Sequence, residues 1–225
     1  MQLVVHNTPE ELARATADRI ASLIRGAGDA FSLGLAGGST PAATYRRLAE
    51  ESLELGHVQA WLSDERWVPP DDERSNGRMA AMTLIDRVGV TFHRPPWGAG
   101  MSPAESAAEY EAVLRSIHRA GPPHLVLLGL GEDGHTASLF PGTQALEMAE
   151  RWFVANKVHQ LGETRLTATY PLLWSARRLM VLAVGERKAE ALKESLDGTT
   201  PAGRLMEGEA EVEWHVDTAA ASLIS

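Results

Sequence analysis

The sequence predicts an α/β fold in which helices flank a mostly parallel sheet. Short apolar runs alternate with amphipathic helical patterns along nearly the whole chain. Several of the runs are bounded by glycine and are apolar at successive positions, as in parallel strands covered on both faces. Such alternation is typical of helices layered on a parallel sheet.

The first part of the chain predicts two helices and two strands. Residues 9–25 are predicted to form a helix, because Pro9 suits its first turn, acidic residues follow, and apolar side chains recur on one face. The apolar run 31–35 predicts a buried strand. A helix is expected at 41–50 and a second strand at 58–63.

The rest of the chain continues the alternation. Residues 103–118 and 186–196 are predicted to be helical, and 124–128 and 179–184 to be parallel strands. Residues 211–216 alternate between polar and apolar side chains, which indicates an outer strand with one exposed face.

No flexible or charged linker divides the chain, so a single domain is predicted over residues 1–225. A domain of this length can bury roughly 70% of its unfolded surface and needs no cross-links. Two segments, 68–78 and 93–103, are rich in Pro, Gly and charge and are expected to be surface loops.

The composition excludes several kinds of site and partner. The chain has no cysteine, which excludes disulfides, thiolate zinc sites and a catalytic thiol. The sequence shows no signal peptide and no apolar stretch near the ~20 residues of a membrane span, so a cytoplasmic protein is expected. The net charge of −9 disfavours nucleic acids and membranes as partners. An anionic small molecule would need cations gathered at one place.

In parallel sheets ligands bind beyond the carboxyl ends of the strands, so the loops after the predicted strands are candidates for a site. The first loop contains Gly38, Ser39 and Thr40, where a glycine turn opens a helix that Thr40 can cap and Pro41 can begin. Backbone N–H groups, hydroxyls and the helix dipole could hold a phosphate there. An ordinary capped turn is the alternative, and a P-loop is excluded because no Lys follows the glycines.

The second loop places Asp64 and Arg66 directly after a strand. Either these residues form a solvated turn, or Arg66 meets an anion while Asp64 orients a substrate hydroxyl. Asn76 lies downstream in a polar segment that could line the same cleft.

The third loop, 129–135, contains the G-x-G-x-x-G spacing of dinucleotide-binding turns. Glu132 and Asp133 would repel a pyrophosphate, and the helix that could follow has only about seven residues. The next strand candidate, 152–155, is not followed by the acidic residue that binds a ribose. The loop instead brings Asp133 near His135, a candidate pair for acid–base catalysis, although a lone His is often structural.

Two further cations could complete an anion site. Arg165 opens an extended segment, and Lys188 lies in the first turn of a predicted helix. A cation at a helix N-terminus opposes the dipole, so a bound anion would explain Lys188; a solvated side chain is the alternative.

Together these loops resemble the 6-phosphogluconolactonase family and, more distantly, the glucosamine-6-phosphate deaminases and isomerases that share its fold. The matching segments follow the family's order and span most of the chain: L-A-G-G-S-T-P (35–41), S-D-E-R-W-V-P (63–69), R-S-N-G-R-M (74–79), G-L-G-E-D-G-H-T-A-S-L-F-P-G (129–142), R-L-T-A-T-Y-P (165–171) and G-E-R-K-A-E-A-L (185–192).

The resemblance implies a Rossmann-like sheet of the sugar-phosphate isomerase/lactonase type. It implies hydrolysis of 6-phospho-D-glucono-1,5-lactone to 6-phospho-D-gluconate, the second step of the oxidative pentose phosphate pathway, with no cofactor and no metal. A monomer or weak homo-oligomer is expected. The roles it implies for residues are these: phosphate binding by Gly38, Ser39, Thr40, Arg165 and Lys188; further substrate contacts by Asp64, Arg66 and Asn76; and catalysis by Asp133 and His135, with His135 as general base.

The same resemblance separates two chemistries. The deaminases resemble D-G-H-I-A-F-N-E-P at the third loop, where a Glu helps the His to move protons. Phe140 occupies that position here and can carry no proton, which favours the lactonase over a deaminase or isomerase. A covalent Ser route is disfavoured because the chain has no G-x-S-x-G elbow. A metal-activated water and a sugar-phosphate sensor that would not need His135 stay open.

Overall fold

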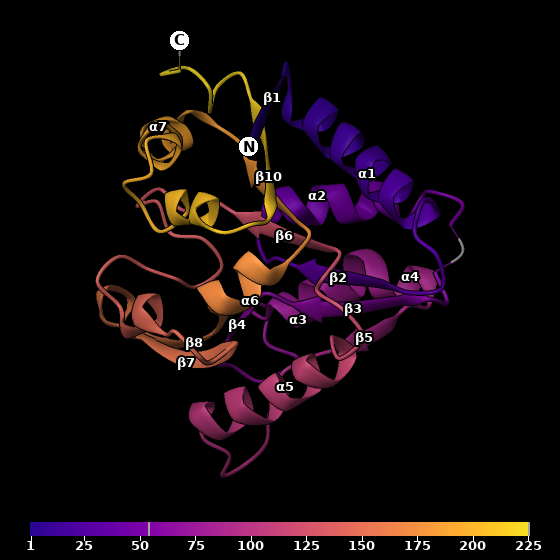
Figure 1. The fold of residues 1–225 in the computed structure, drawn as a ribbon, viewed down its shortest axis with the longest axis vertical. Helices are drawn as coiled ribbons and strands as arrows, with labels where there is room; N and C mark the ends of the chain where they lie inside the picture. The colour runs from indigo at the N-terminus through magenta and orange to yellow at the C-terminus, as the bar shows by residue number, and fades with distance from the viewer. Residues whose placement is uncertain (54, 225) are drawn as a thin grey trace.

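A seven-stranded parallel sheet forms the centre of the computed structural model, which describes residues 1–53 and 55–224 (Figure 1). Its strand order is β1-β10-β9-β6-β2-β3-β5, and every neighbouring pair is parallel. The strands are β1 (Gln2–His6), β2 (Phe31–Leu35), β3 (Val58–Leu62), β5 (Thr91–His93), β6 (Leu125–Gly129), β9 (Arg178–Ala183) and β10 (Glu211–Asp217).

Helices cover both faces of this sheet, as the α/β prediction requires. The helices are α1 (Pro9–Arg25), α2 (Ser39–Leu48), α3 (Asn76–Ala80), α4 (Asp86–Val88), α5 (Pro103–Ile117), α6 (Tyr170–Ser175) and α7 (Ala189–Leu196), with a π-helical turn at Ala81–Ile85. Leu33 and Leu127 face a core that α1 and α2 cover, whereas Val126 and Val181 face one that α5, α6 and α7 cover. The predicted fold class is therefore confirmed. Within the described residues no helix is long and apolar enough to cross a bilayer.

A second, antiparallel sheet of three strands stands beside the carboxyl ends of the main strands. It consists of β4 (Asp64–Arg66), β8 (Glu163–Ala168) and β7 (Phe153–Val158), in that order. Ser63 joins β3 directly to β4, and it connects the two sheets by accepting a hydrogen bond from the N–H of Ala168 and donating its own N–H to Leu35. The expectation that Asp64 and Arg66 lie in a loop is thus wrong, because they form strand β4, which pairs with β8.

Strand β10 is not the outer strand that its alternating pattern indicates. It lies between β1 and β9, and β1 forms the edge of the sheet. Glu211 is exposed, but the other polar positions of β10 are buried. They have partners: Glu213 pairs with Arg19 and Arg178, and His215 lies 3.1 Å from a ring nitrogen of His6. The alternation therefore reflects an internal polar network and not solvent.

The prediction of a surface loop over residues 68–78 is wrong at the C-terminal end of that segment. Ser75 and Asn76 are buried, and helix α3 begins at Asn76. The buried carboxylate of Glu65 accepts the N–H groups of Asn76 at 2.7 Å and Gly77 at 2.8 Å, which satisfies the start of the helix. This polar segment can be buried because its N–H groups donate to the buried carboxylate of Glu65.

Two helix starts also differ from the predictions. Helix α2 begins at Ser39, with Gly38 preceding it at φ +102°, so Thr40 lies inside the first turn and does not cap it. No helix follows the third loop, where residues 135–140 form turns instead. The helix expected at 186–196 begins as a 3-10 turn that ends at Lys188, before α7 starts.

Candidate active site

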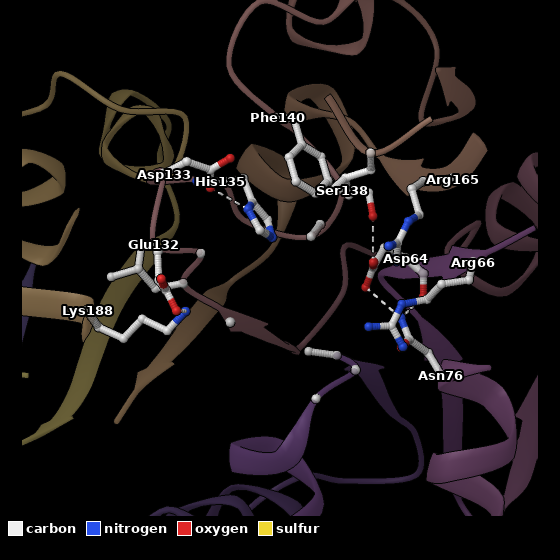
Figure 2. Close-up of a pocket in the computed structure, with 18 residues that line it drawn as sticks. Asp64, Arg66, Asn76, Glu132, Asp133, His135, Ser138, Phe140, Arg165 and Lys188 are labelled. Carbon is white, nitrogen blue, oxygen red and sulfur yellow. Dashed lines mark hydrogen bonds and ion pairs between the residues drawn. The ribbon is translucent and has the colours of Figure 1, made fainter. Parts of the chain in front are cut away.

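The loops that follow β2, β3, β6 and β9 surround one cavity of about 490 Å³ at the carboxyl edge of the sheet (Figure 2). This is where the parallel topology places a ligand site. The predicted site residues that line it are Gly38, Asp64, Arg66, Asn76, Asp133, His135, Arg165 and Lys188. Ala137, Ser138 and Leu161 also line it, and the sequence did not single them out as site residues.

Ser39 and Thr40 are not among the residues that line this cavity. Ser39 is exposed and Thr40 half-buried, both in the first turn of α2. The neighbouring Gly37 does line the cavity, and its Cα lies so close to Asn76 that an added Cβ would stand 1.9 Å from the Asn76 side chain. The glycine turn therefore reaches the cavity, while hydroxyl contacts from Ser39 and Thr40 stay a prediction.

The glycines of the third loop serve a tight turn under the histidine. The N–H of Gly131 donates to the carbonyl of His135 at 2.8 Å, and a Cβ at Gly131 would lie 2.0 Å from the imidazole. Gly134 has φ +75° and packs against Thr200, which leaves no room for a side chain. The second and third glycines of the G-x-G-x-x-G spacing are thus explained by the turn that presents His135.

Asp133 and His135 form a close pair at the upper wall of the cavity (Figure 2). Nδ1 of His135 lies 2.5 Å from Oδ1 of Asp133, and the imidazole is 28% exposed. Partial burial raises the pKa of Asp133, but the hydrogen bond and charge of His135 outweigh it, so the net pKa lies below the ordinary value. Ionised Asp133 holds a proton on Nδ1, which leaves the Nε2 lone pair free to accept a proton.

Phe140 fixes the plane of the imidazole. Its ring stacks on His135 with centroids 3.9 Å apart and an interplanar angle of 24°, and Phe140 is buried. The sequence indicated only that Phe140 carries no proton. The stacking adds that this residue restricts ring rotation, because a buried aromatic covers one face of the imidazole.

A strained turn links the histidine loop to the small sheet. Ala137 has φ +47°, a left-handed conformation that costs a non-glycine residue of order 1 kcal/mol. The next residue, Ser138, donates its hydroxyl to Asp64 at 2.7 Å and its N–H to Thr167 at 3.1 Å. Its position inside the specific 129–142 motif was the signal that could have identified it.

Asp64 is buried, and each oxygen of its carboxylate accepts one hydrogen bond. Oδ2 accepts the hydroxyl of Ser138, and Oδ1 accepts the amide of Asn76 at 3.1 Å. The same amide donates to the Asp64 carbonyl at 2.9 Å. These bonds hold Asp64 and Asn76 rigidly at the wall opposite Asp133, as Figure 2 shows.

Arg66 and Arg165 form an electropositive wall. They are cross-strand partners in the β4–β8 pair, and the Nε of each is buried without an acceptor among the described residues. Burial and then the charge of Arg66 lower the pKa of Arg165, although Glu163 lies 2.7 Å from its guanidinium. Like charges directly opposite each other are destabilising, so an anion beside them would relieve the repulsion.

Lys188 reaches the cavity from the side opposite the two arginines (Figure 2). Its Nζ lies 4.0 Å from Glu132, a carboxylate that the sequence indicated only as a repulsive group. No three His, Asp or Glu side chains lie close enough to share a metal ion anywhere in the described part of the chain.

Comparisons with known proteins point to one family. The family model of glucosamine-6-phosphate isomerases/6-phosphogluconolactonase matches residues 7–214. A 6-phosphogluconolactonase of Nostoc sp. is 36% identical over 208 residues, which cover 87% of this chain and 85% of that protein. One of Rhizobium meliloti is 37% identical over 200 residues, which cover 85% of each.

Two solved structures are similar over nearly their whole length. The 6-phosphogluconolactonase of Trypanosoma brucei has a TM-score of 0.86 at 29% identity and covers 100% of this chain and 98% of its own. A monomeric glucosamine-6-phosphate deaminase has the same TM-score of 0.86 at 26% identity, covering 99% and 100%. The chain therefore belongs to the glucosamine-6-phosphate isomerase/6-phosphogluconolactonase family, as its sequence motifs predict.

Proposed function

We propose that this chain hydrolyses 6-phospho-D-glucono-1,5-lactone to 6-phospho-D-gluconate, the second step of the oxidative pentose phosphate pathway. The observation that carries the proposal is the pairing of His135 with Asp133 in a cavity whose opposite wall presents Arg66 and Arg165. The names of the relatives support the same activity. Four further points stay predictions: the chain forms one domain, needs no cofactor or metal, acts in the cytoplasm, and is a monomer or weak homo-oligomer.

The reaction needs one base that later acts as an acid. Nε2 of His135 takes a proton from water as the water oxygen bonds to C1 of the lactone. Ionised Asp133 stabilises the imidazolium that forms. The imidazolium then protonates the ring oxygen as the bond between C1 and that oxygen breaks, which restores neutral His135 and gives the open-chain acid.

The phosphate anchors the substrate away from C1. Arg66 and Arg165 supply two guanidinium groups from the small sheet, the Gly38 turn supplies backbone N–H groups, and Lys188 can approach from the other side. Binding energy gained at this remote group orients C1 toward the histidine. Asp64 and Asn76 are placed to contact sugar hydroxyls.

Phe140 favours this reaction over sugar-phosphate deamination. The overall fold does not distinguish them, since a deaminase matches the chain as well as a lactonase does. Ring opening and isomerisation of an amino sugar need a second group that relays protons beside the histidine. The buried phenyl ring of Phe140 stacks on His135 and can neither give nor take a proton.

A direct assay tests the proposal. The purified chain is expected to release acid from freshly generated 6-phosphogluconolactone faster than the spontaneous rate, and to release no ammonia from glucosamine 6-phosphate. A chelator should leave the rate unchanged. A rate equal to the spontaneous one would overturn the lactonase assignment, and a loss of activity that zinc restores would support a metal-activated water instead.

Replacing Arg165 with alanine is expected to raise KM by about 10- to 100-fold, because a hydrogen bond to a charged group contributes ~1.5–3 kcal/mol. The value of kcat should change much less, since the guanidinium lies at the phosphate end. Steady-state kinetics on Arg165→Ala measures both constants. Arg119→Ala, at an exposed position after α5, is the control. A fall in kcat at constant KM would contradict the assigned role.

A further inference from the structure

Glu132 places a carboxylate in a cavity that is proposed to bind a phosphate. It lines the cavity beside Lys188, and Nζ of Lys188 lies 4.0 Å from Oε1 of Glu132. Figure 2 shows the Lys188 side chain extended toward Glu132, on the far side from Arg165. A carboxylate at this point repels a phosphate and attracts the lysine that could hold one.

Resting on the proposed function, we propose that Glu132 is a positioning residue that binds Lys188 before substrate arrives and competes with the substrate phosphate for it. When a phosphate enters, Lys188 turns from the carboxylate to the phosphate. The affinity for the phosphate therefore depends on how much more strongly Lys188 interacts with the phosphate than with Glu132.

Arg187 lowers the cost of separating Lys188 from Glu132, because it stays paired with the same carboxylate. Its guanidinium lies 2.8 Å from Oε1 of Glu132, its side chain is 84% exposed, and Arg187 is not among the residues that line the cavity. Glu132 thus keeps a closer partner after Lys188 leaves, and its charge is not left unpaired. Lys188, at 4.0 Å and 25% exposed, is the more loosely held of the two cations.

Competition between Glu132 and phosphate for Lys188 also favours phosphorylated over neutral substrates. A phosphate monoester carries close to two negative charges at neutral pH, because its second pKa is about 6. Glu132 carries one, so the dianion can displace it from Lys188. A neutral sugar lactone offers Lys188 no charge at all and leaves the Glu132–Lys188 pair intact.

Inhibition by inorganic phosphate tests the proposal. In E132Q the inhibition constant for phosphate is expected to fall about three- to fivefold, the size of a partly exposed ion pair. Glu186→Gln removes a carboxylate from the same turn as Lys188 but outside the cavity lining, and should change the constant by less than twofold. An unchanged or raised constant in E132Q would overturn the proposal.

The same substitution in a Lys188→Met variant distinguishes competition for Lys188 from direct repulsion between Glu132 and phosphate. In Lys188→Met, phosphate binds more weakly, and adding E132Q should then change the constant by less than 1.5-fold. If E132Q still lowers the constant threefold there, Glu132 repels phosphate directly and the proposal is wrong. Should wild type show no lactonase activity, the proposed function fails, while calorimetry with inorganic phosphate on the same variants still decides the Glu132–Lys188 exchange.

Discussion

Replacing His135 with alanine is expected to lower kcat for 6-phosphogluconolactone by about 10²–10⁴-fold, the contribution of a positioned general base. The imidazole is the group that Asp133 and Phe140 hold in one orientation at the cavity wall. KM should remain close to the wild-type value, because the phosphate contacts are unchanged.

The measurement is acid release under saturating substrate, corrected for spontaneous hydrolysis. His159→Ala serves as the matched control, since His159 is exposed on the connection between β7 and β8. Equal rates for His135→Ala and wild type would remove His135 from the mechanism without removing the activity.

Replacing Glu65 with alanine is expected to lower the free energy of unfolding by about 3–5 kcal/mol, because buried donors left without an acceptor cost ~1–3 kcal/mol each. Burial raises the pKa of Glu65 above its ordinary value, and four hydrogen bonds offset only part of that effect. They come from the N–H groups of Arg66, Asn76 and Gly77 and from the hydroxyl of Ser75.

Urea unfolding of Glu65→Ala and of Glu105→Ala gives the comparison. Glu105 also accepts from the start of a helix, in the capping box of α5, but it is exposed, so its loss should cost only ~1 kcal/mol. Similar losses for the two variants would show that the Glu65 carboxylate is not the anchor of α3.

Local pattern was enough to predict most of the main sheet and the loops that meet in the cavity. The helix 9–25 and the strand 31–35 have the predicted bounds, because a capping residue and Pro9 mark the start of the helix, and large apolar residues stand at both ends of the strand. The cavity followed from topology alone, since parallel strands bring their carboxyl ends to one edge.

The strand candidate 152–155 and the extended segment that Arg165 opens correspond to parts of β7 and β8. Their pairing into a small sheet could not be predicted, because its residues are buried by partners that are distant in sequence. Asp64 looks like a solvated charge until Ser138 and Asn76 donate to it. The same holds for the arginine wall. No local pattern shows that Arg66 and Arg165 face each other, because that contact depends on the register of β4 against β8.

The two ends of the site belong to different sheets. The arginines belong to the small sheet, the histidine to a loop of the large one, and Ser63 joins the two without any intervening loop. A substrate held by both ends therefore contacts groups on both sheets, so a change in how the sheets pack would move the phosphate contacts relative to the imidazole.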